Sequence, residues 1–255
     1  MNKTMELPDN FMPQPVAGKK VLVTGGTTGI GRAIVLLLAS QGADVVFFGH
    51  EQHHLNDALV DIYKIAKGKV FGYVADVSDE KDIHYILQQA DEKLGGLDIL
   101  INNAAIGFSN VTDGSYKDIQ KVVNINLLAY MAFCAGAIER MQVKGSGHIV
   151  NIGSMSAEVR EATGSVYVAT KSGIQGFSVA MRKQVNPMGI KVSLIEPGAV
   201  DTDLQQKPTP AKLEDIESGE MLMADDIASA VLYCLCQPSR CDVVEIKIKP
   251  HNQLI

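Results

Sequence analysis

The chain has 255 residues, which is enough for one large α/β domain or two small ones. Hydrophobic residues make up 46% and charged residues 20%, the usual composition of a soluble globular protein. The net charge is −6 and no basic cluster stands out, so we expect neither nucleic acid nor a membrane surface as a partner. No apolar run reaches the roughly 18 residues that span a bilayer.

The four cysteines form no CxxC pair and no cluster with metal-ligand spacing. We therefore expect reduced thiols, a cytoplasmic protein and no bound metal. Residues 1–17 hold three prolines and no apolar stretch of the secretory type, so we interpret them as a flexible arm or as a strap over a neighbouring subunit. Residues 18–255 are expected to form one domain, because no linker or repeat divides them.

A glycine-rich turn near the N-terminus has the spacing G-x-x-x-G-x-G. The apolar run 20–23 before it predicts a buried strand, and residues 32–39 after it have the apolar periodicity of a helix. In this context, such glycines let the backbone approach a pyrophosphate at the helix N-terminus, and a plain tight turn is the alternative. The turn residues expected to bind a dinucleotide are Gly25, Thr27, Thr28, Gly29, Ile30 and Gly31.

Downstream, strand patterns and helix patterns alternate along the chain. This alternation predicts a Rossmann-like, doubly wound parallel α/β sheet of about seven strands with helices on both faces. We expect Ser78 to be the N-cap of the third helix, and the polar, proline-bearing segment 203–223 to be a mobile lid. The remaining expected strands are 43–49, 69–75, 97–101, 148–152, 190–195 and 243–248, and the remaining expected helices are 51–66, 79–94, 116–141, 164–186 and 224–236.

Tyr167 and Lys171 stand four positions apart in the expected helix 164–186, so their side chains share a face, with Cβ atoms about 5–6 Å apart. An ammonium beside a phenol favours the phenolate, so we expect Lys171 to lower the pKa of Tyr167 and allow proton exchange near neutral pH. Ser154, just after strand 148–152, is placed to hold a substrate oxygen. Taken alone, Y-x-x-x-K is short and common and more often marks a surface pair on an amphipathic helix, and the rest of the chain is what favours catalysis.

Together, the motifs resemble those of the short-chain dehydrogenase/reductase family, single-domain type, over about residues 18–249. They stand in the family's order: T-G-x3-G-I-G, D-V, N-N-A, an asparagine, a serine, Y-x3-K and P-G. The resemblance implies that Tyr167 is the acid/base, that Lys171 tunes it and holds the nicotinamide ribose, and that Ser154 holds the substrate oxygen. It assigns a proton-relay water to Asn126, rather than to Asn124. It also implies cofactor contacts at Asp76, Val77, Asn103, Tyr167, Lys171, Pro197, Gly198, Val200 and Thr202.

The chain departs from the family pattern at two places. Ala105 stands where the family motif N-N-A-G has glycine, and we expect its extra methyl group to be tolerated. The C-terminal strand lacks the glycine-rich ending of the fatty-acid-type reductases, and resembles relatives that act on small hydroxy acids and assorted carbonyls. The family also implies a homo-oligomer, a tetramer or a dimer, in which helices 116–141 and 164–186 pair with their copies.

The end of the second strand indicates NADP(H) as the cofactor. NAD enzymes of this fold place there a carboxylate that binds the ribose 2′-hydroxyl, whereas this chain has Gly49. His50 follows, where NADP-dependent relatives often have arginine. Against this, Thr28 replaces another arginine of those relatives, Glu51 adds a negative charge, and His50 could simply cap the next helix. NAD is therefore the alternative cofactor.

The sequence thus predicts an oxidoreductase that transfers hydride between NADP(H) and a small-molecule carbonyl or secondary alcohol. One alternative is an NAD-dependent alcohol or hydroxy-acid dehydrogenase. Another is a non-catalytic dinucleotide-binding regulator, which would need neither Ser154 nor the Tyr167–Lys171 pair. A nucleotide-sugar epimerase or dehydratase is disfavoured, because such relatives are longer and have a separate substrate domain. The lid and the loop after Ile106 carry no charge pattern that names the substrate.

Overall fold

The computed structural model describes residues 13–205 and 207–255. Residues 1–12 of the predicted flexible arm lie outside these ranges. The remainder of that arm is attached to the domain: the backbone N–H of Gln14 donates to the Cys236 carbonyl at 2.8 Å, and the Val16 side chain is buried in the core. The predicted flexible arm therefore does not include residues 13–17, because an apolar side chain is stabilised by burial.

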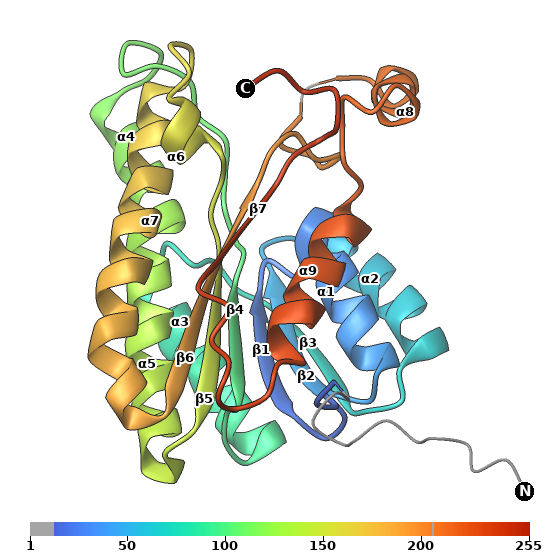
Figure 1. Cartoon of the computed structure of the whole chain (residues 1–255), viewed down its shortest axis with the longest axis vertical. Coiled ribbons are helices and arrows are strands. Elements are labelled where there is room, and N and C mark those ends of the chain that lie inside the picture. The colour runs from blue at the N-terminus through green and yellow to red at the C-terminus, as the bar shows by residue number, and fades with distance from the viewer. Residues whose placement is uncertain (1–12, 206) are drawn as a thin grey trace, which may run out of the picture.

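All strands of the described chain belong to one parallel sheet. They are β1 Lys20–Thr24, β2 Asp44–Gly49, β3 Val70–Val74, β4 Ile99–Asn102, β5 Gly147–Ile152, β6 Ile190–Pro197 and β7 Glu245–Ile248. Their spatial order is β3-β2-β1-β4-β5-β6-β7 (Figure 1). The chain reverses its direction of winding between β1 and β4, the point at which doubly wound sheets bind ligands. The predicted fold class is confirmed.

Helices cover both faces of the sheet. They are α1 Gly29–Ser40, α2 Gln52–Ile65, α3 Glu80–Leu94, α4 Tyr116–Val123, α5 Ala129–Lys144, α6 Ser156–Val159, α7 Ser165–Val185, α8 Thr209–Glu217 and α9 Ala224–Leu235, with a 3-10 turn at Asn186–Met188. In β1, Val21 and Val23 pack beneath α1, α2 and α9, whereas Leu22 packs beneath α3, α5 and α7. Because both faces are buried, the central strands read as continuous apolar runs.

The helix predicted over 116–141 is continuous but changes its winding. The π-helical segment η2, Asn124–Leu128, joins α4 to α5. By length and composition the stretch Tyr116–Lys144 is apolar enough to cross a membrane, although the sequence holds no uninterrupted apolar run of that length. Half of its most apolar part is buried within the domain, as in a core helix. Single π turns inside α-helices are frequent at functional sites, and Asn126 lies in this one.

The segment 203–223 is not an irregular lid throughout, because it contains α8. Pro210 occupies the first turn of α8, where a missing N–H leaves no helical hydrogen bond unmade. Beyond α8 the chain returns to the end of β6, where the N–H of Leu222 donates to the Ala199 carbonyl at 2.9 Å. The prolines that suggested a lid therefore begin a helix.

Two other local expectations differ in the structure. Ser78 is not the N-cap of α3: the Asp79 carboxylate accepts from the Lys81 N–H at 2.9 Å, while the Ser78 hydroxyl donates to Asp76 at 2.7 Å. An aspartate one residue later thus satisfies the orphan helix donor. The last strand begins at Glu245 rather than at Val243, and the short helix α6 was not expected.

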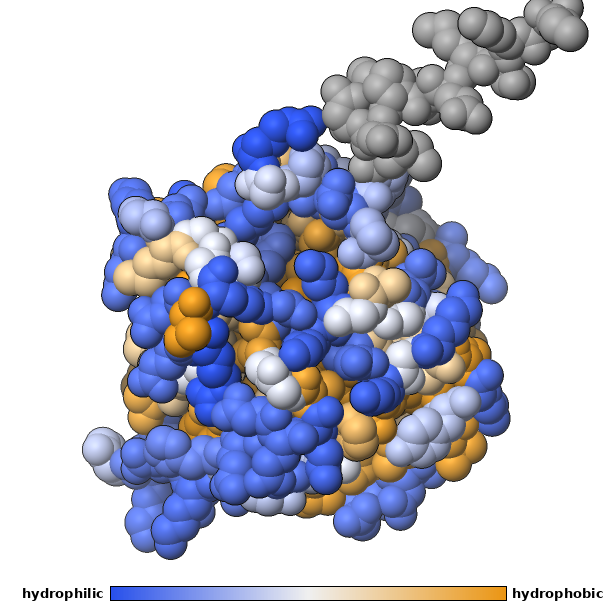
Figure 2. Space-filling view, turned by 90° about the horizontal axis from the view of Figure 1, so that it is seen from below, coloured by the Kyte–Doolittle hydropathy of each residue, from blue (hydrophilic) through white to orange (hydrophobic). Residues whose placement is uncertain are grey.

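The carboxyl ends of the strands all lie at the upper edge of the sheet, near α6 and α8 (Figure 1). The loops that carry most of the predicted site residues leave from this edge. At the opposite end, hydrophilic residues predominate and hydrophobic residues show between and beside them (Figure 2). Ligand chemistry is therefore expected at the upper edge, where parallel sheets bind their ligands.

Candidate active site

The glycine turn has a backbone that other residues would not allow. Gly25 and Gly29 have φ angles of 65° and 49°, in the left-handed region. A Cβ on Gly31 would lie 2.0 Å from the Gly25 carbonyl oxygen, so no side chain fits there. No side chain within the described ranges caps the start of α1 at Thr28. The first N–H groups of α1 are therefore available to an anionic ligand.

Asn103 fixes the glycine turn to the end of β4. Its amide nitrogen donates to the carbonyl oxygens of Gly25 at 3.0 Å and Thr24 at 3.2 Å. In return, the Thr24 hydroxyl accepts from the backbone N–H groups of Asn103 and Ala104, at 2.9 and 3.0 Å. The two strands that flank the switch point of the sheet are thus joined by side chains at their ends.

The ends of β2 and β3 bring the predicted adenosine-side residues together. A Cβ on Gly49 would lie 2.1 Å from the Thr27 hydroxyl oxygen, so the end of β2 touches the glycine turn. His50 follows with 72% of its side chain exposed. Asp76 lies near His50. Burial raises the pKa of Asp76, but two hydrogen bonds from Ser78 outweigh this effect, so the pKa lies below its ordinary value. Val77 is buried beside it.

Lys171 is the buried cation of the site. Only 2% of this residue is exposed, and its Nζ donates to the Ile152 carbonyl, at the end of β5, at 3.0 Å. The Nζ lies 5.7 Å from the ring centroids of both Tyr167 and Tyr130. Burial lowers the pKa of Lys171 to about 8, and the negative charge of Glu196 works against that decrease. The ammonium therefore loses its proton within reach of physiological pH.

The pKa of Tyr167 is shifted in the direction opposite to our expectation. Burial raises it to about 12, and the interaction with the Ser154 hydroxyl only partly opposes the rise. Lys171 does not lower it, because its Nζ is bonded to a carbonyl rather than to the phenol. Ser154 and Tyr167 are nevertheless brought together as predicted. At neutral pH this phenol therefore keeps its proton.

Asn126 connects the π segment to the loop after β4. Its side-chain oxygen accepts from the Ile106 N–H at 2.9 Å, and its amide nitrogen donates to the Ile106 carbonyl at 2.8 Å. The same nitrogen lies 3.4 Å from the Thr170 hydroxyl, one residue before Lys171. Asn126 is fully buried, whereas Asn124 is half-exposed. The side chain of Asn126 thus touches two of the segments that surround the Tyr167–Lys171 pair.

The loop after β6 closes the site from the other side. Gly198 begins it, and its N–H donates to the Ile248 carbonyl of β7 at 2.7 Å, while the Pro197 carbonyl accepts from Met155 at 2.9 Å. Val200 is buried. The Thr202 side chain lies beside the glycine turn, since a Cβ on Gly29 would be 3.1 Å from its methyl carbon. The structure therefore brings this loop to the start of α1.

Glu196 is a neighbour of the site that the sequence did not single out. It is fully buried on β6, and its Oε1 has no hydrogen-bond partner within the described ranges. Its Oε2 accepts from Gln175 at 3.4 Å, one turn beyond Lys171 on α7. Burial and the nearby Glu245 carboxylate raise the pKa of Glu196 to about 7. A glutamate inside an apolar strand run, directly before the P-G motif, was the available sequence signal.

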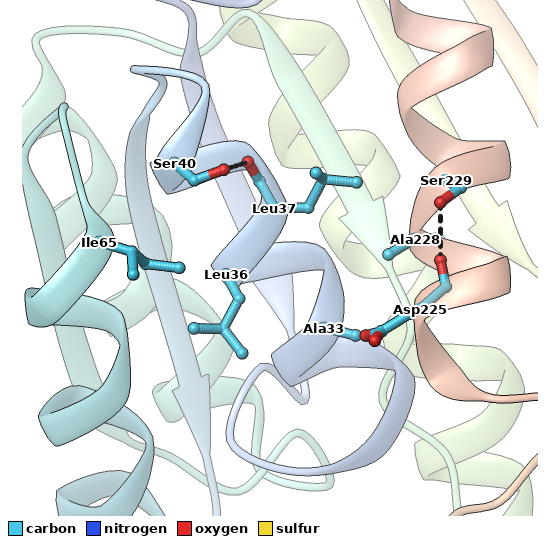
Figure 3. A pocket seen from close by; sticks show the side chains of 8 residues that line it. All are labelled: Ala33, Leu36, Leu37, Ser40, Ile65, Asp225, Ala228 and Ser229. Atoms are coloured by element: carbon cyan, nitrogen blue, oxygen red, sulfur yellow. Dashed lines mark hydrogen bonds between the residues drawn. The ribbon is translucent and has the colours of Figure 1, made fainter.

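A groove of about 330 Å³ elsewhere on the surface carries no comparable chemistry. It lies between α1, α2 and α9 (Figure 3). Its serine hydroxyls already donate to backbone carbonyls, from Ser40 to Leu37 at 2.7 Å and from Ser229 to Asp225 at 2.9 Å. Apolar side chains such as Leu36 and Ile65 form most of the rest of the lining. This groove is not the candidate active site.

Fold and site together define a class: a doubly wound parallel sheet with a glycine turn at its switch point and a Ser–Tyr–Lys set at its carboxyl edge. A family model described as short chain dehydrogenase matches residues 19–213. The chain is 31% identical to an uncharacterised oxidoreductase of Staphylococcus aureus (strain MRSA252), over 91% of this chain and 97% of that one. A similar relative in Staphylococcus epidermidis (strain ATCC 35984) is 31% identical over 92% and 98%.

Solved structures that resemble this chain are described as dehydrogenases. A short chain dehydrogenase from Burkholderia cenocepacia J2315, in complex with NADP, has a TM-score of 0.82 at 28% identity, and covers 93% of this chain and 98% of that one. A dehydrogenase/reductase from Sinorhizobium meliloti 1021 has a TM-score of 0.81 at 30% identity, with 92% and 94% covered. The chain therefore belongs to the short-chain dehydrogenase family, and it is an oxidoreductase.

The contact between Glu196 and α7 generates a prediction about Lys171. In Glu196→Gln the nearby negative charge is lost, so the pKa of Lys171 should fall below about 8. An NMR titration of 13Cε-labelled lysine reports this value directly. Glu158→Gln is the matched control: it removes a like charge that raises the pKa of Glu196, so Glu196 ionises at lower pH and the pKa of Lys171 does not fall. Equal titration of Lys171 in both variants would contradict the proposed influence of Glu196.

Proposed function

We propose that the protein is an NADP(H)-dependent reductase or dehydrogenase that interconverts a small-molecule carbonyl and a secondary alcohol. The observation that carries the proposal is the gathering of Ser154, Tyr167 and Lys171 at the same carboxyl edge of the sheet as the uncapped start of α1. A dinucleotide fits the residues present, because the left-handed glycines of the turn and the uncapped N–H groups of α1 form a backbone cradle suited to a pyrophosphate. When bound, the cofactor would supply or accept the hydride.

The residues that would hold the cofactor surround this cradle. The glycine turn would bind the pyrophosphate, Asp76 and Val77 the adenine, and Asn103 the adenosine ribose. Lys171 would hold the nicotinamide ribose through its Nζ. The loop after β6 would bind the carboxamide with Val200 and Thr202. The full set is Gly25, Thr27, Thr28, Gly29, Ile30, Gly31, His50, Asp76, Val77, Asn103, Tyr167, Lys171, Pro197, Gly198, Val200 and Thr202.

The protein's own chemistry in this proposal is proton transfer. In the reducing direction the Ser154 hydroxyl holds the carbonyl oxygen, and Tyr167 donates its phenolic proton to that oxygen as negative charge develops there. The raised pKa of Tyr167 keeps this proton in place at neutral pH. Asn126, in the π segment, positions the water that returns a proton toward Lys171.

A non-catalytic dinucleotide-binding regulator is the main alternative from another class. It would retain the glycine turn but would have no need of a buried ammonium 5.7 Å from a phenol ring. Burying such a charge is costly, so its retention supports catalysis. An NAD-dependent alcohol or hydroxy-acid dehydrogenase uses the same site and differs only at the end of β2.

Tyr167→Phe should reduce kcat by about 10²–10⁴-fold while leaving cofactor affinity nearly unchanged, because phenylalanine keeps the ring but has no exchangeable proton. The substrate for this test comes from a screen of carbonyls and alcohols followed by nicotinamide absorbance. Tyr63→Phe is the matched control, since Tyr63 is 60% exposed on α2. A Tyr167→Phe enzyme with near-wild-type kcat would remove Tyr167 from the acid/base role.

The preference for NADP(H) rests on the end of β2. Gly49 leaves no room for a side chain next to Thr27, so no carboxylate is present there to bind a 2′-hydroxyl or to repel a 2′-phosphate. The exposed imidazole of His50 follows directly in the chain. Glu51, whose carboxylate lies 3.2 Å from that ring, opposes the binding of an anion there. The preference is therefore expected to depend on the His50 side chain.

With EDTA present, His50→Gln should weaken NADPH affinity by several-fold, because the side chain proposed to meet the 2′-phosphate is lost, whereas NADH affinity should change little. Fluorescence titration of both cofactors measures this. A preference of the wild-type protein for NADH, or equal catalytic efficiency with both cofactors, would overturn the assignment.

We also propose a homo-oligomer, a tetramer or a dimer, located in the cytoplasm. Leu128 is 55% exposed on the 116–144 helix, with half-buried Met131 and Ile138 farther along. These apolar side chains support a helix pairing with a second copy. The four cysteines are all free thiols, which supports a reducing compartment.

Light scattering at micromolar concentration should report two or four copies, and Leu128→Lys should shift the protein toward smaller species, because a charge in an apolar interface is costly. Val143→Lys, at an 86% exposed position near the end of the same helix, is the control and should leave the mass unchanged. A monomeric wild-type protein would refute the proposed assembly.

A further inference from the structure

Four residues at the start of α2 place three imidazole rings around one carboxylate. In the run His50-Glu51-Gln52-His53-His54, the Glu51 oxygens lie 3.2 Å from His50 Nε2, 3.3 Å from His53 Nε2 and 3.4 Å from His54 Nδ1. The rings of His53 and His54 lie with their centroids 4.0 Å apart. One ligand atom each from Glu51, His53 and His54 lies within 4.8 Å of the other two. Cysteine spacing gave us no reason to expect a metal, but this cluster uses other ligands.

The side chains of the cluster are close together but do not form hydrogen bonds with one another. Among the hydrogen bonds of the described ranges, none joins the Glu51 carboxylate to these rings, although all three distances would permit one. Glu51 stands at the N-cap position of α2 yet makes no side-chain cap hydrogen bond. The plain alternative is that the rings share the charge of Glu51 when they are protonated. Convergence of the His53 and His54 nitrogens on one oxygen of a carboxylate that caps nothing is also what a shared cation would require.

We propose that Glu51, His53 and His54 form a site for a divalent first-row transition metal ion, with His50 on the other oxygen of Glu51 and outside this group of three. Imidazole nitrogen with one carboxylate suits zinc, nickel and copper, whereas magnesium and calcium prefer oxygen ligands only. The site is open to solvent, since the His53 side chain is 68% exposed. The positive end of the α2 dipole disfavours a cation there, and the Glu51 charge offsets it.

The site is tested by calorimetric titration of untagged, EDTA-treated protein with NiCl₂. Nickel is the probe because thiolates compete less well for it than for zinc, and this chain has four free cysteines. We expect one nickel ion per chain, with binding weakened by about tenfold or more in Glu51→Gln and in His54→Gln. Both variants change exposed or half-exposed side chains, and their melting in EDTA checks that they fold.

His84→Gln is the matched control. His84 also lies beside a glutamate on a helix surface, with Nε2 3.7 Å from Glu80, but no third ligand residue within the described ranges completes a group there. Nickel affinity should be unchanged in this variant. If wild type, Glu51→Gln, His54→Gln and His84→Gln bind nickel alike, or if wild type binds none at millimolar concentration, the proposal is overturned.

A metal ion bound at this site should also affect cofactor affinity, an inference that rests on the proposed function. His50 follows Gly49, which touches the glycine turn, so a bound cation would put positive charge beside the expected 2′-phosphate. Nickel should then tighten NADPH more than NADH, and His84→Gln should retain this effect. Calorimetry without cofactor tests the metal site alone, so equal effects on the two cofactors would overturn the NADP assignment and not the site.

Discussion

The hydrogen bond from the Lys171 ammonium to the Ile152 carbonyl is the interaction on which the site depends. An ammonium in a nearly dry environment needs hydrogen-bond acceptors, and this carbonyl accepts from both Lys171 at 3.0 Å and the Tyr130 hydroxyl at 3.2 Å. Ile152 ends β5, so the bond ties the middle of α7 to the carboxyl edge of the sheet. The position of Tyr167, one turn earlier, follows from that bond.

A second set of contacts joins strand ends that the sheet itself does not hold. The Thr24 hydroxyl accepts from the backbone after β4, and Asn103 donates to the glycine turn. Thr202, after β6, lies against the start of α1. The glycine turn is thus hydrogen-bonded to the loop after β4 and packed against the loop after β6. Such a site can be rigid although loops build it, because the contacts between the loops fix their positions.

The sheet could be predicted from sequence because its strands are buried on both faces and therefore appear as apolar runs, as in Val21-Leu22-Val23. The glycine turn was predictable because steric exclusion at Gly31 leaves one residue type. The π segment was not, since one extra residue in a helical turn leaves the periodicity of 116–144 almost unchanged. Helix α8 was not predictable either, because proline, here Pro210, is common both in loops and in first helical turns.

Burial and charge at the site were the least predictable features. Spacing alone places Lys171 beside Tyr167, but whether the ammonium points to the phenol or to a carbonyl depends on which strand ends beneath it. Glu196 went unnoticed because its significance comes from what surrounds it: α7 on one side, and Glu245 and Lys247 of β7 on the other. The partner of the Lys171 ammonium and the surroundings of Glu196 both depend on long-range packing, which no local sequence pattern encodes.

The protonation state of the buried pair follows from these same contacts. Burial raises the pKa of Tyr167 to about 12, so the phenol keeps its proton at neutral pH. The Lys171 ammonium lies 5.7 Å from the ring centroid and donates to the Ile152 carbonyl, and burial lowers its pKa to about 8. Burial therefore favours the uncharged form of both side chains, and a neutral phenol suits the proton-donor role that we propose for Tyr167 in carbonyl reduction.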